Sequence, residues 1–412
     1  MAAAKMTDFM VVLFYACWDW RFLSLIAFSS GVDFWASKQM AASTDQMHKR
    51  RFLVLSLLVN LGFLGFFKYY NFFLDNFVSA FSFFGTPINA QGLNIILPVG
   101  ISFYTFQTLS YTIDVYKRKL EPTKDFIAFT AFVSFFPQLV AGPIERASNL
   151  LPQFYNRRIF NKENALRGVR LILWGLAKKV VIADSIAPAV DDIFSNCERY
   201  PSTILLLGAF LFSFQIYCDF SGYSMMARGV SKLFGFELMT NFKYPYFSRN
   251  IGEFWRRWHI SLSTWFRDYL YIPLGGSRVS KLLNIRNVFV IFLVSGFWHG
   301  ANWTFVFWGA IHAILYIPVF LMGRNRLYAD NVIAQNSWLP SLKEVFQVAL
   351  TFTLVTFSRI FFRSESITDA FGFIGRIFTD FSYLSYSHPM GYRMIDYYIL
   401  ILFFVFYEFF AV

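Results

Sequence analysis

FWHGANWTFVFWGAIHA, residues 297–313, places a Trp-His dipeptide at the junction of two strongly apolar runs. An ionisable side chain such as His299 is costly at membrane depth and is usually functional there. Histidine also exchanges its proton near neutral pH, as acid–base catalysis requires. We therefore expect His299 to take part in acid–base chemistry inside a membrane protein.

The composition is that of a polytopic membrane protein. Of the 412 residues, 56% are hydrophobic and 15% are charged, whereas soluble domains carry about 25% charged residues. The mean hydropathy is +0.46. The formal net charge is +12, and the basic residues lie in the connections between apolar runs. This pattern favours orientation in a bilayer and contact with anionic lipid over nucleic-acid binding, and a basic face could also meet an anionic cytosolic substrate.

Several common kinds of site have no signature in the sequence. The three cysteines, Cys17, Cys197 and Cys218, are far apart and lack the spacing of a metal site or a disulfide framework. The chain also lacks a Gly-x-Ser-x-Gly elbow, a P-loop and an HExxH sequence. A serine hydrolase, a nucleoside triphosphatase or a zinc peptidase of the usual types is therefore not expected, and we expect no metal site and no bound cofactor.

Apolar runs predict an all-α fold. A spanning helix needs about 20 mostly apolar residues, and some of the runs are short enough to be re-entrant or interfacial. We expect roughly ten or eleven spanning or re-entrant helices in a single integral membrane domain over residues 1–412. Because the last run continues to the end of the chain, we expect a later span to be missing. The runs are 9–17, 21–36, 52–73, 93–115, 126–141, 169–183, 203–220, 287–300, 302–322, 344–362 and 395–412.

Charge predicts the orientation of the chain in the membrane. Residues 48–51 and 117–119 are basic, whereas residues 75–94 contain no Lys or Arg. By the positive-inside rule the basic connections, including the long basic stretch 228–286, lie in the cytoplasm. Glycine and proline interrupt the apolar runs at 97–100 and 136–143. Broken helices are tolerated where the freed backbone faces protein or a wet cavity, so they predict an internal chamber, with packing kinks as the alternative.

A second Trp-His dipeptide lies within residues 254–269. Residues 252–272 are amphipathic rather than spanning, so we expect one helix that can lie at the membrane interface, and its spacing places His259 on the same face as Trp255. In the functional interpretation, His259 faces the chamber, and Arg256 and Arg257 attract a phosphorylated donor. In the alternative, the segment is a surface helix with a packed histidine and solvated arginines.

Polar residues near the first dipeptide are further candidates. Asn302 and Trp303 follow His299 by three and four residues, so on a helix they would share its face and could orient its ring. His312 is farther along, and we expect it to be a hydrogen-bonded packing residue.

The segment FQIYCDFSGY, residues 214–223, is a polar cluster at the end of an apolar run. Its Asp219 and Ser221 either line a substrate tunnel or cap a helix. The residues alone leave both interpretations open.

Together these segments resemble the membrane-bound O-acyltransferase family. The likeness is strongest to its bacterial branch, which includes the membrane subunit of alginate O-acetylation and the teichoic-acid D-alanylation membrane protein, and residues 254–276 look more like the alginate type. It runs over almost the whole chain. The matching stretches are FKYY 67–70, LPVGISFYTFQ 97–107, FPQLVAGP 136–143, residues 214–223, both Trp-His segments and RIFFR 359–363.

The resemblance implies a fold of many helices around a central tunnel in a bacterial cytoplasmic (inner) membrane. It maps the active-site histidine of the family onto His299 and its second histidine onto His259. It further implies acetyl transfer from cytosolic acetyl-CoA to a hydroxyl group of an exported polysaccharide, directly or through an extracytoplasmic partner of the SGNH-hydrolase type. The first apolar stretch of the family looks clipped before Met1, and its last span is absent after Val412.

Other functions fit the same residues. A proton-coupled transporter or flippase also uses broken helices and a histidine at mid-depth. D-alanyl transfer to a cell-wall polymer and a structural partner that anchors another transferase are two more alternatives. Whether His299 is transiently acylated, and what His259 does, the sequence leaves open.

Overall fold

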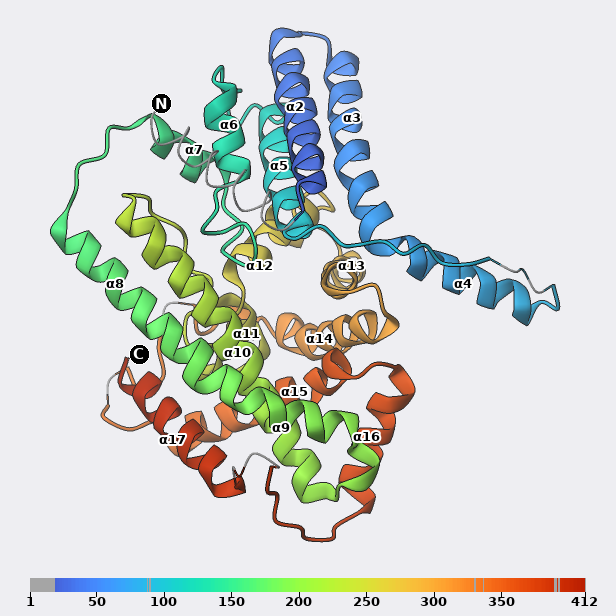
Figure 1. Cartoon of the computed structure of the whole chain (residues 1–412), viewed down its shortest axis with the longest axis vertical. Helices are drawn as coiled ribbons and strands as arrows, with labels where there is room; N and C mark the ends of the chain where they lie inside the picture. Colours follow the sequence, from blue (N-terminus) through green and yellow to red (C-terminus); the bar gives the residue numbers. More distant parts are fainter. Residues whose placement is uncertain are drawn as a thin grey trace. The chain divides into compact units, whose positions relative to one another are not determined.

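The computed structural model describes residues 19–86, 88, 90–329, 331–335, 337–388, 391 and 393–411. Within these ranges the regular secondary structure is helical (Figure 1), apart from one isolated bridge between Ser387 and Arg393. The prediction of an all-α fold is therefore confirmed. The apolar run 9–17 lies outside the described residues.

In the described part of the chain, six helices are long and apolar enough to cross a membrane. The prediction of roughly ten or eleven spanning or re-entrant helices is confirmed in part, because some predicted runs form helices that are too short or too polar to count as spans. The helix α2 (Arg21–Ala42) is long enough but contains polar residues such as Asp33, and α6 (Phe126–Val133) has only 8 residues. The six helical segments are Gln46–Phe83, Ser202–Leu233, Lys281–His299, Trp303–Leu321, Leu342–Arg363 and Met394–Ala411.

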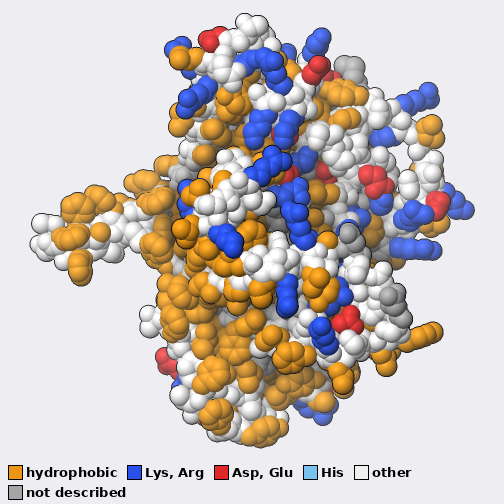
Figure 2. Space-filling view, turned by 180° about the vertical axis from the view of Figure 1, so that it is seen from behind, with side chains coloured by type: hydrophobic (Ala, Val, Ile, Leu, Met, Phe, Trp, Pro, Cys, Tyr) orange, Lys and Arg blue, Asp and Glu red, His pale blue; other side chains and the backbone are white. Residues whose placement is uncertain are grey.

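The surface agrees with a membrane environment. Figure 2 shows hydrophobic side chains over broad continuous areas, with Lys and Arg side chains gathered in other areas. Large apolar residues such as Phe346 and Phe403 are 68% and 69% exposed. Such exposure is unfavourable in water, so these side chains face lipid.

The chain divides into two compact units, residues 1–170 with 227–239 and residues 171–226 with 240–412. In the first unit, α2, α3 (Gln46–Leu64) and α5 (Ile101–Tyr116) lie side by side (Figure 1). Its other helices are α4 (Tyr70–Phe83), α6, α7 (Ala147–Tyr155) and the start of α8 (Lys162–Leu176); the π-helical turn Gly65–Tyr69 joins α3 to α4.

A buried polar cluster joins three helices of the first unit. Asn60 donates to both carboxylate oxygens of Asp33, at 3.0 and 2.9 Å, and Ser56 donates to Asp33 at 2.5 Å. The side-chain Oδ1 of Asn60 accepts from the hydroxyl groups of Ser29 at 2.8 Å and Thr108 at 3.0 Å. Because each of these polar groups has a partner, the cluster fixes the helices without leaving a desolvated group exposed to hydrocarbon.

The two glycine–proline interruptions of the first unit pack against each other. Gly100 has a φ of 78°, and a Cβ placed there would lie 2.5 Å from the carbonyl oxygen of Leu139. Only glycine allows this conformation and this approach. At this position the freed backbone therefore faces protein, as the packing-kink alternative predicts.

The second unit contains the later apolar helices. They are α9 (Asp184–Ser195), most of α10 (Ser202–Leu233), α11 (Ile251–Arg257), α12 (Ile260–Phe266), α13 (Lys281–His299), α14 (Trp303–Leu321), α15 (Leu342–Arg363), α16 (Ile367–Thr379) and α17 (Met394–Ala411). Polar caps set some of their ends. At the start of α15, the Ser341 hydroxyl accepts from the Glu344 N–H at 3.3 Å, and the Glu344 carboxylate accepts from the Ser341 N–H at 3.0 Å, which is a capping box.

The helices α13 and α14 form a closely packed hairpin. A Cβ at Gly296 would lie 2.2 Å from the carbonyl oxygen of Phe305, and one at Gly309 would lie 2.3 Å from that of Phe292. Since any side chain at these two positions would clash with backbone, glycine is what lets the two helices touch. The hairpin places its connection, residues 300–302, directly after His299.

Candidate active site

His299 is the last residue of α13, where the hairpin turns. Its imidazole is partly exposed and lies among aromatic rings, with centroid distances of 4.8 Å to Trp298, 5.2 Å to Trp308 and 5.4 Å to Phe362. The sequence prediction that His299 sits between two apolar helices is confirmed.

Asn302 begins the next helix rather than sharing a face with His299. Its side-chain oxygen accepts from the Thr304 N–H at 2.9 Å, and its amide donates to the Glu365 carbonyl oxygen at 2.8 Å. The expected common helical face of Asn302, Trp303 and His299 is wrong, because the helix ends at His299 and Gly300 is extended. Trp303 is 53% exposed, and a role for either residue in substrate binding remains a prediction.

The second histidine lies at a break in the backbone. Residues 251–266 form two short helices, α11 and α12, and His259 between them adopts a left-handed conformation with φ 45° and ψ 55°. The prediction of one continuous amphipathic helix is therefore wrong here, and Trp255 and His259 point to different neighbours. A left-handed residue other than glycine costs about 1–3 kcal/mol and is often found at a functional site.

Asn241 holds this strained turn in place. Its main-chain carbonyl oxygen accepts from the Ile260 N–H at 2.9 Å. Its side-chain oxygen accepts from the N–H and the hydroxyl of Ser261, at 3.3 and 3.0 Å. Its amide nitrogen donates to the Ser224 hydroxyl at 3.3 Å. One buried asparagine thus ties the turn to α10.

The same contacts fix the tautomer of His259. Asn241 Oδ1 faces the His259 Nδ1 at 3.1 Å. Because this oxygen already accepts from the backbone N–H of Ser261, it is an acceptor, so Nδ1 carries the proton and Nε2 has the lone pair. Among the described residues, the buried Nε2 has no hydrogen-bond partner.

Burial keeps this imidazole neutral. His259 is 1% exposed, and loss of water, followed by the proximity of His299, lowers its pKa well below the ordinary value. The ring packs at right angles to Phe220, with centroids 4.6 Å apart. A neutral histidine with a bare nitrogen can accept a proton or a hydrogen bond.

Trp298 joins the two histidines. Its ring centroid lies 4.8 Å from that of His299 and 6.1 Å from that of His259. The structure therefore brings together the two histidines that the sequence singled out, one partly exposed and one buried. Such a pair is suited to moving a proton during group transfer.

Comparisons with known proteins agree with this arrangement. Residues 118–362 match the membrane-bound O-acyltransferase family. The chain is 42% identical over 371 residues to a probable alginate O-acetylase of Pseudomonas syringae pv. tomato, covering 89% of this chain and 68% of the relative. It is 36% identical over 385 residues to a peptidoglycan O-acetyltransferase of Helicobacter pylori, covering 87% and 70%. The similarity to a teichoic acid D-alanyltransferase of Bacillus subtilis is lower, at 28% over 295 residues, covering 66% and 70%.

The chain belongs to the membrane-bound O-acyltransferase family. The resemblance inferred from the sequence is confirmed, including its greater likeness to the alginate type. This chain is accordingly an O-acyltransferase and a multi-pass membrane protein, and the transporter and anchoring alternatives are not supported. His259, His299 and Asn241 all lie within the matched region.

In this membrane-bound O-acyltransferase, Arg256 and Arg257 form hydrogen bonds and an ion pair with neighbouring protein groups. Arg256 donates to the carbonyl oxygen of Asn325. Arg257 pairs with the buried carboxylate of Glu253 at 2.9 Å and donates to the Asn331 carbonyl oxygen at 3.0 Å. A donor phosphate would have to displace these partners, so the contacts do not favour donor binding by Arg256 and Arg257. That role remains a prediction.

Asp219 and Ser221 lie inside α10, which continues to Leu233. The helix-capping alternative is therefore wrong for both residues. Asp219 pairs with Lys179 at 2.5 Å, and its side chain is 50% exposed. Ser221 is buried, and its hydroxyl has no hydrogen-bond partner among the described residues. Their predicted role in a substrate tunnel of this O-acyltransferase remains a prediction.

Sequence reasoning missed the residues that support His259. Asn241 follows α10 in a loop without a pattern, so only the structure reveals its contacts. Arg359 is the first residue of the RIFFR stretch. Its buried guanidinium lies 4.4 Å from the ring centroid of Trp258 and donates to the Tyr246 hydroxyl. Arg359 thus supports the residue immediately before His259.

Proposed function

We propose that this enzyme transfers an acetyl group from cytosolic acetyl-CoA to a hydroxyl group of an exported or cell-surface polysaccharide. The relatives named for O-acetylation of alginate and peptidoglycan support this acyl group and this class of acceptor. We place the enzyme in the cytoplasmic membrane of a bacterium. As the sequence resemblance implies, an extracytoplasmic transferase of the SGNH-hydrolase type would complete the transfer where the acceptor is outside.

The observation that carries the chemistry is the meeting of two histidines at Trp298. In our proposal, neutral His299 removes the proton from the acceptor hydroxyl, and the oxygen attacks the thioester carbonyl. The C–S bond breaks as the new ester C–O bond forms, and the coenzyme A thiolate takes up the proton from His299. His299 is assigned this role because its ring is partly exposed and can be reached by an acceptor.

We assign His259 to positioning. Its Nε2 lone pair accepts a hydrogen bond from a group that enters beside Trp298, and its low pKa keeps this nitrogen available at neutral pH. Because Asn241 fixes the proton on Nδ1, the ring does not need to reorganise before each turnover.

The acceptor is a polysaccharide hydroxyl, and two kinds deserve testing. Identity is 42% to the probable alginate O-acetylase and 36% to the peptidoglycan O-acetyltransferase. D-alanyl transfer is the runner-up, because the relative that performs it is 28% identical.

The proposal is tested with the purified chain in lipid nanodiscs and acetyl-CoA labelled in its acetyl group. Alginate-like and peptidoglycan fragments serve as acceptors, with a D-alanyl donor as the competing substrate. Replacing His299 with Ala should lower the transfer rate about 10²–10⁴-fold, which is the usual contribution of general base catalysis. A His299→Ala protein that folds, inserts and transfers acetyl at the wild-type rate would contradict the assignment.

A further inference from the structure

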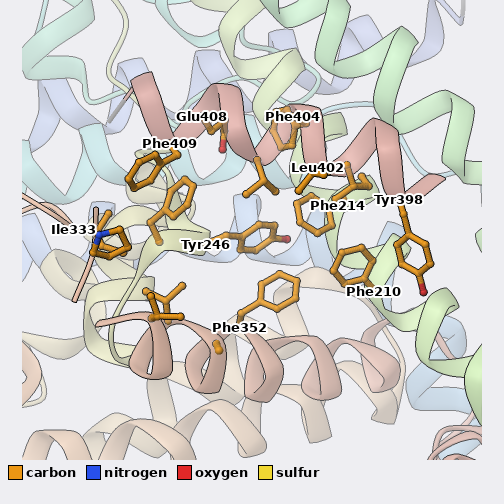
Figure 3. A pocket seen from close by; sticks show the side chains of 17 residues that line it. Phe210, Phe214, Tyr246, Ile333, Phe352, Tyr398, Leu402, Phe404, Glu408 and Phe409 are labelled. Carbon is orange, nitrogen blue, oxygen red and sulfur yellow. The ribbon is translucent and has the colours of Figure 1, made fainter. Parts of the chain in front are cut away.

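A cavity separate from the histidine pair lies between α10, α15 and α17 of the second unit (Figure 3). Its volume is about 560 Å³, within the range of about 300–1,000 Å³ that is usual for small-molecule sites. Aromatic rings make much of its wall, including Phe210 and Phe214 from α10, Phe352 from α15 and Phe404 from α17. We call this cavity the α15–α17 groove.

Two polar side chains in the wall already have protein partners. Glu408 accepts from Lys178 at 2.5 Å and from the Tyr217 hydroxyl at 2.9 Å. The Tyr246 hydroxyl donates to the Ser213 carbonyl oxygen and accepts from Arg359. A water molecule inside a protein needs two to four polar partners. Glu408 and the Tyr246 hydroxyl do not supply them, because they are already hydrogen-bonded to protein groups. The groove therefore suits hydrocarbon.

The mouth of the groove opens on the lipid-facing surface. Val345 on α15, and Tyr398 and Leu402 on α17, line the groove and are at the same time 48%, 41% and 70% exposed. Both helices are long and apolar enough to cross a membrane. Hydrocarbon chains of the bilayer therefore surround the opening.

One end of the groove suits a charged headgroup. Ile333 and Pro340 line the groove just before α15 begins. The first turn of α15 carries Lys343, which is exposed. A lysine near the end of a membrane helix extends its ammonium group to the interface, where it can meet a phosphate.

We propose that the α15–α17 groove binds one acyl chain of a bilayer phospholipid, with the phosphate near Lys343. The size of the groove favours this occupant over a helix, because a helix with its side chains is about 10–12 Å across. The bound chain packs against the ring of Tyr246, whose hydroxyl holds Arg359. This site is separate from the acetyl donor and acceptor sites proposed above and does not depend on them.

The test uses the full chain in vesicles that contain phosphatidylglycerol with a photoactivatable diazirine in one acyl chain. After irradiation and digestion, mass spectrometry should find the label on groove residues of both α15 and α17. Replacing Ala349, which lines the groove, with Trp should fill it and lower this labelling severalfold. Val348→Phe is a smaller change with the same expected direction, in case Ala349→Trp does not fold.

The matched control is Leu350→Trp. Leu350 is the next residue, is 49% exposed and does not line the groove, so this change should leave the labelling of the groove as in the wild type. Equal labelling in wild type, Ala349→Trp and Val348→Phe would overturn the proposal. Protection of the groove together with a cross-linked dimer would also overturn it, because a second copy of the chain would then occupy the site.

Discussion

His312 and His259 are both buried in the second unit, each about 1% exposed, but their nitrogens are used differently. His312 accepts from the Trp255 indole N–H at Nδ1, at 3.3 Å, and its Nε2 donates to the Ser358 hydroxyl at 3.0 Å. Both nitrogens therefore serve the packing of helices, as the sequence predicted for His312. His259 uses only Nδ1, and its Nε2 remains without a protein partner among the described residues.

The backbone shows the same contrast. His312 lies in the middle of α14, whereas His259 is left-handed between two short helices. Strain and an unsatisfied buried nitrogen are both unfavourable for folding. Finding them together at His259 indicates that His259 serves the chemistry, while His312 serves stability.

The sharpest test of this contrast replaces each histidine with Ala. For His259→Ala we expect acyl transfer to fall about 10–100-fold, because the entering group loses the hydrogen bond that positions it, a loss of about 1–3 kcal/mol, with thermal stability close to wild type. For His312→Ala we expect the opposite, with activity per folded molecule retained. Rates with labelled donor and thermal unfolding in detergent measure the two effects. Equal loss of activity in both variants would remove the distinction.

Substitution of Asn241 should show how much of the contribution of His259 to the rate depends on the orientation of its ring. In Asn241→Ala, His259 and Ser261 lose a shared acceptor, which costs about 1–3 kcal/mol for each buried group left without a partner. We expect kcat to fall more than KM changes. Asn241→Asp keeps an acceptor oxygen and should recover part of the rate. If Asn241→Ala lowered stability but left kcat unchanged, the hydrogen bonds of Asn241 would have a structural role only.

The pH dependence of stability should distinguish His259 from a solvated histidine. Its folded pKa lies well below the unfolded value of about 6.5. Above about pH 6.5 the imidazole of His259 is neutral in both the folded and the unfolded protein, so it does not make stability depend on pH. Below about pH 6.5 the imidazole binds a proton in the unfolded protein but not in the folded protein. Stability should then fall by up to about 1.4 kcal/mol per pH unit. Unfolding of wild type and His259→Gln between pH 8 and 5 measures this term, and identical slopes would contradict it.

The smallest expected effect concerns Arg257. Because Arg257 already pairs with Glu253 at 2.9 Å, we expect Arg257→Gln to change stability more than KM for acetyl-CoA. Steady-state kinetics of Arg257→Gln measure both effects, and Lys281→Gln, at the exposed first residue of α13, serves as the control at a second basic position. A large increase in KM for Arg257→Gln alone would show that its guanidinium binds donor phosphate after all.

The sequence predicted the all-α membrane fold, the family, His299 at the end of an apolar helix and the packing role of His312. It did not predict the break at His259, because the periodicity of residues 252–272 favours one helix, whereas the turn is stabilised by contacts with Asn241, which lies 18 residues away in the sequence. The prediction that His299 and Asn302 share one helical face was wrong for a related reason. Gly300 ends the helix, and a Cβ there would lie 2.1 Å from the Phe305 ring, a constraint that spacing does not reveal.

The close glycine contacts between α13 and α14 restrict how this enzyme can open. Backbone touches backbone at Gly296 and Gly309, so sliding one helix along the other would require steric overlap at both points. The hairpin should consequently travel as one rigid body, carrying His299 with it. Any gating motion that admits a substrate has to occur along the outer edges of the hairpin rather than along its seam.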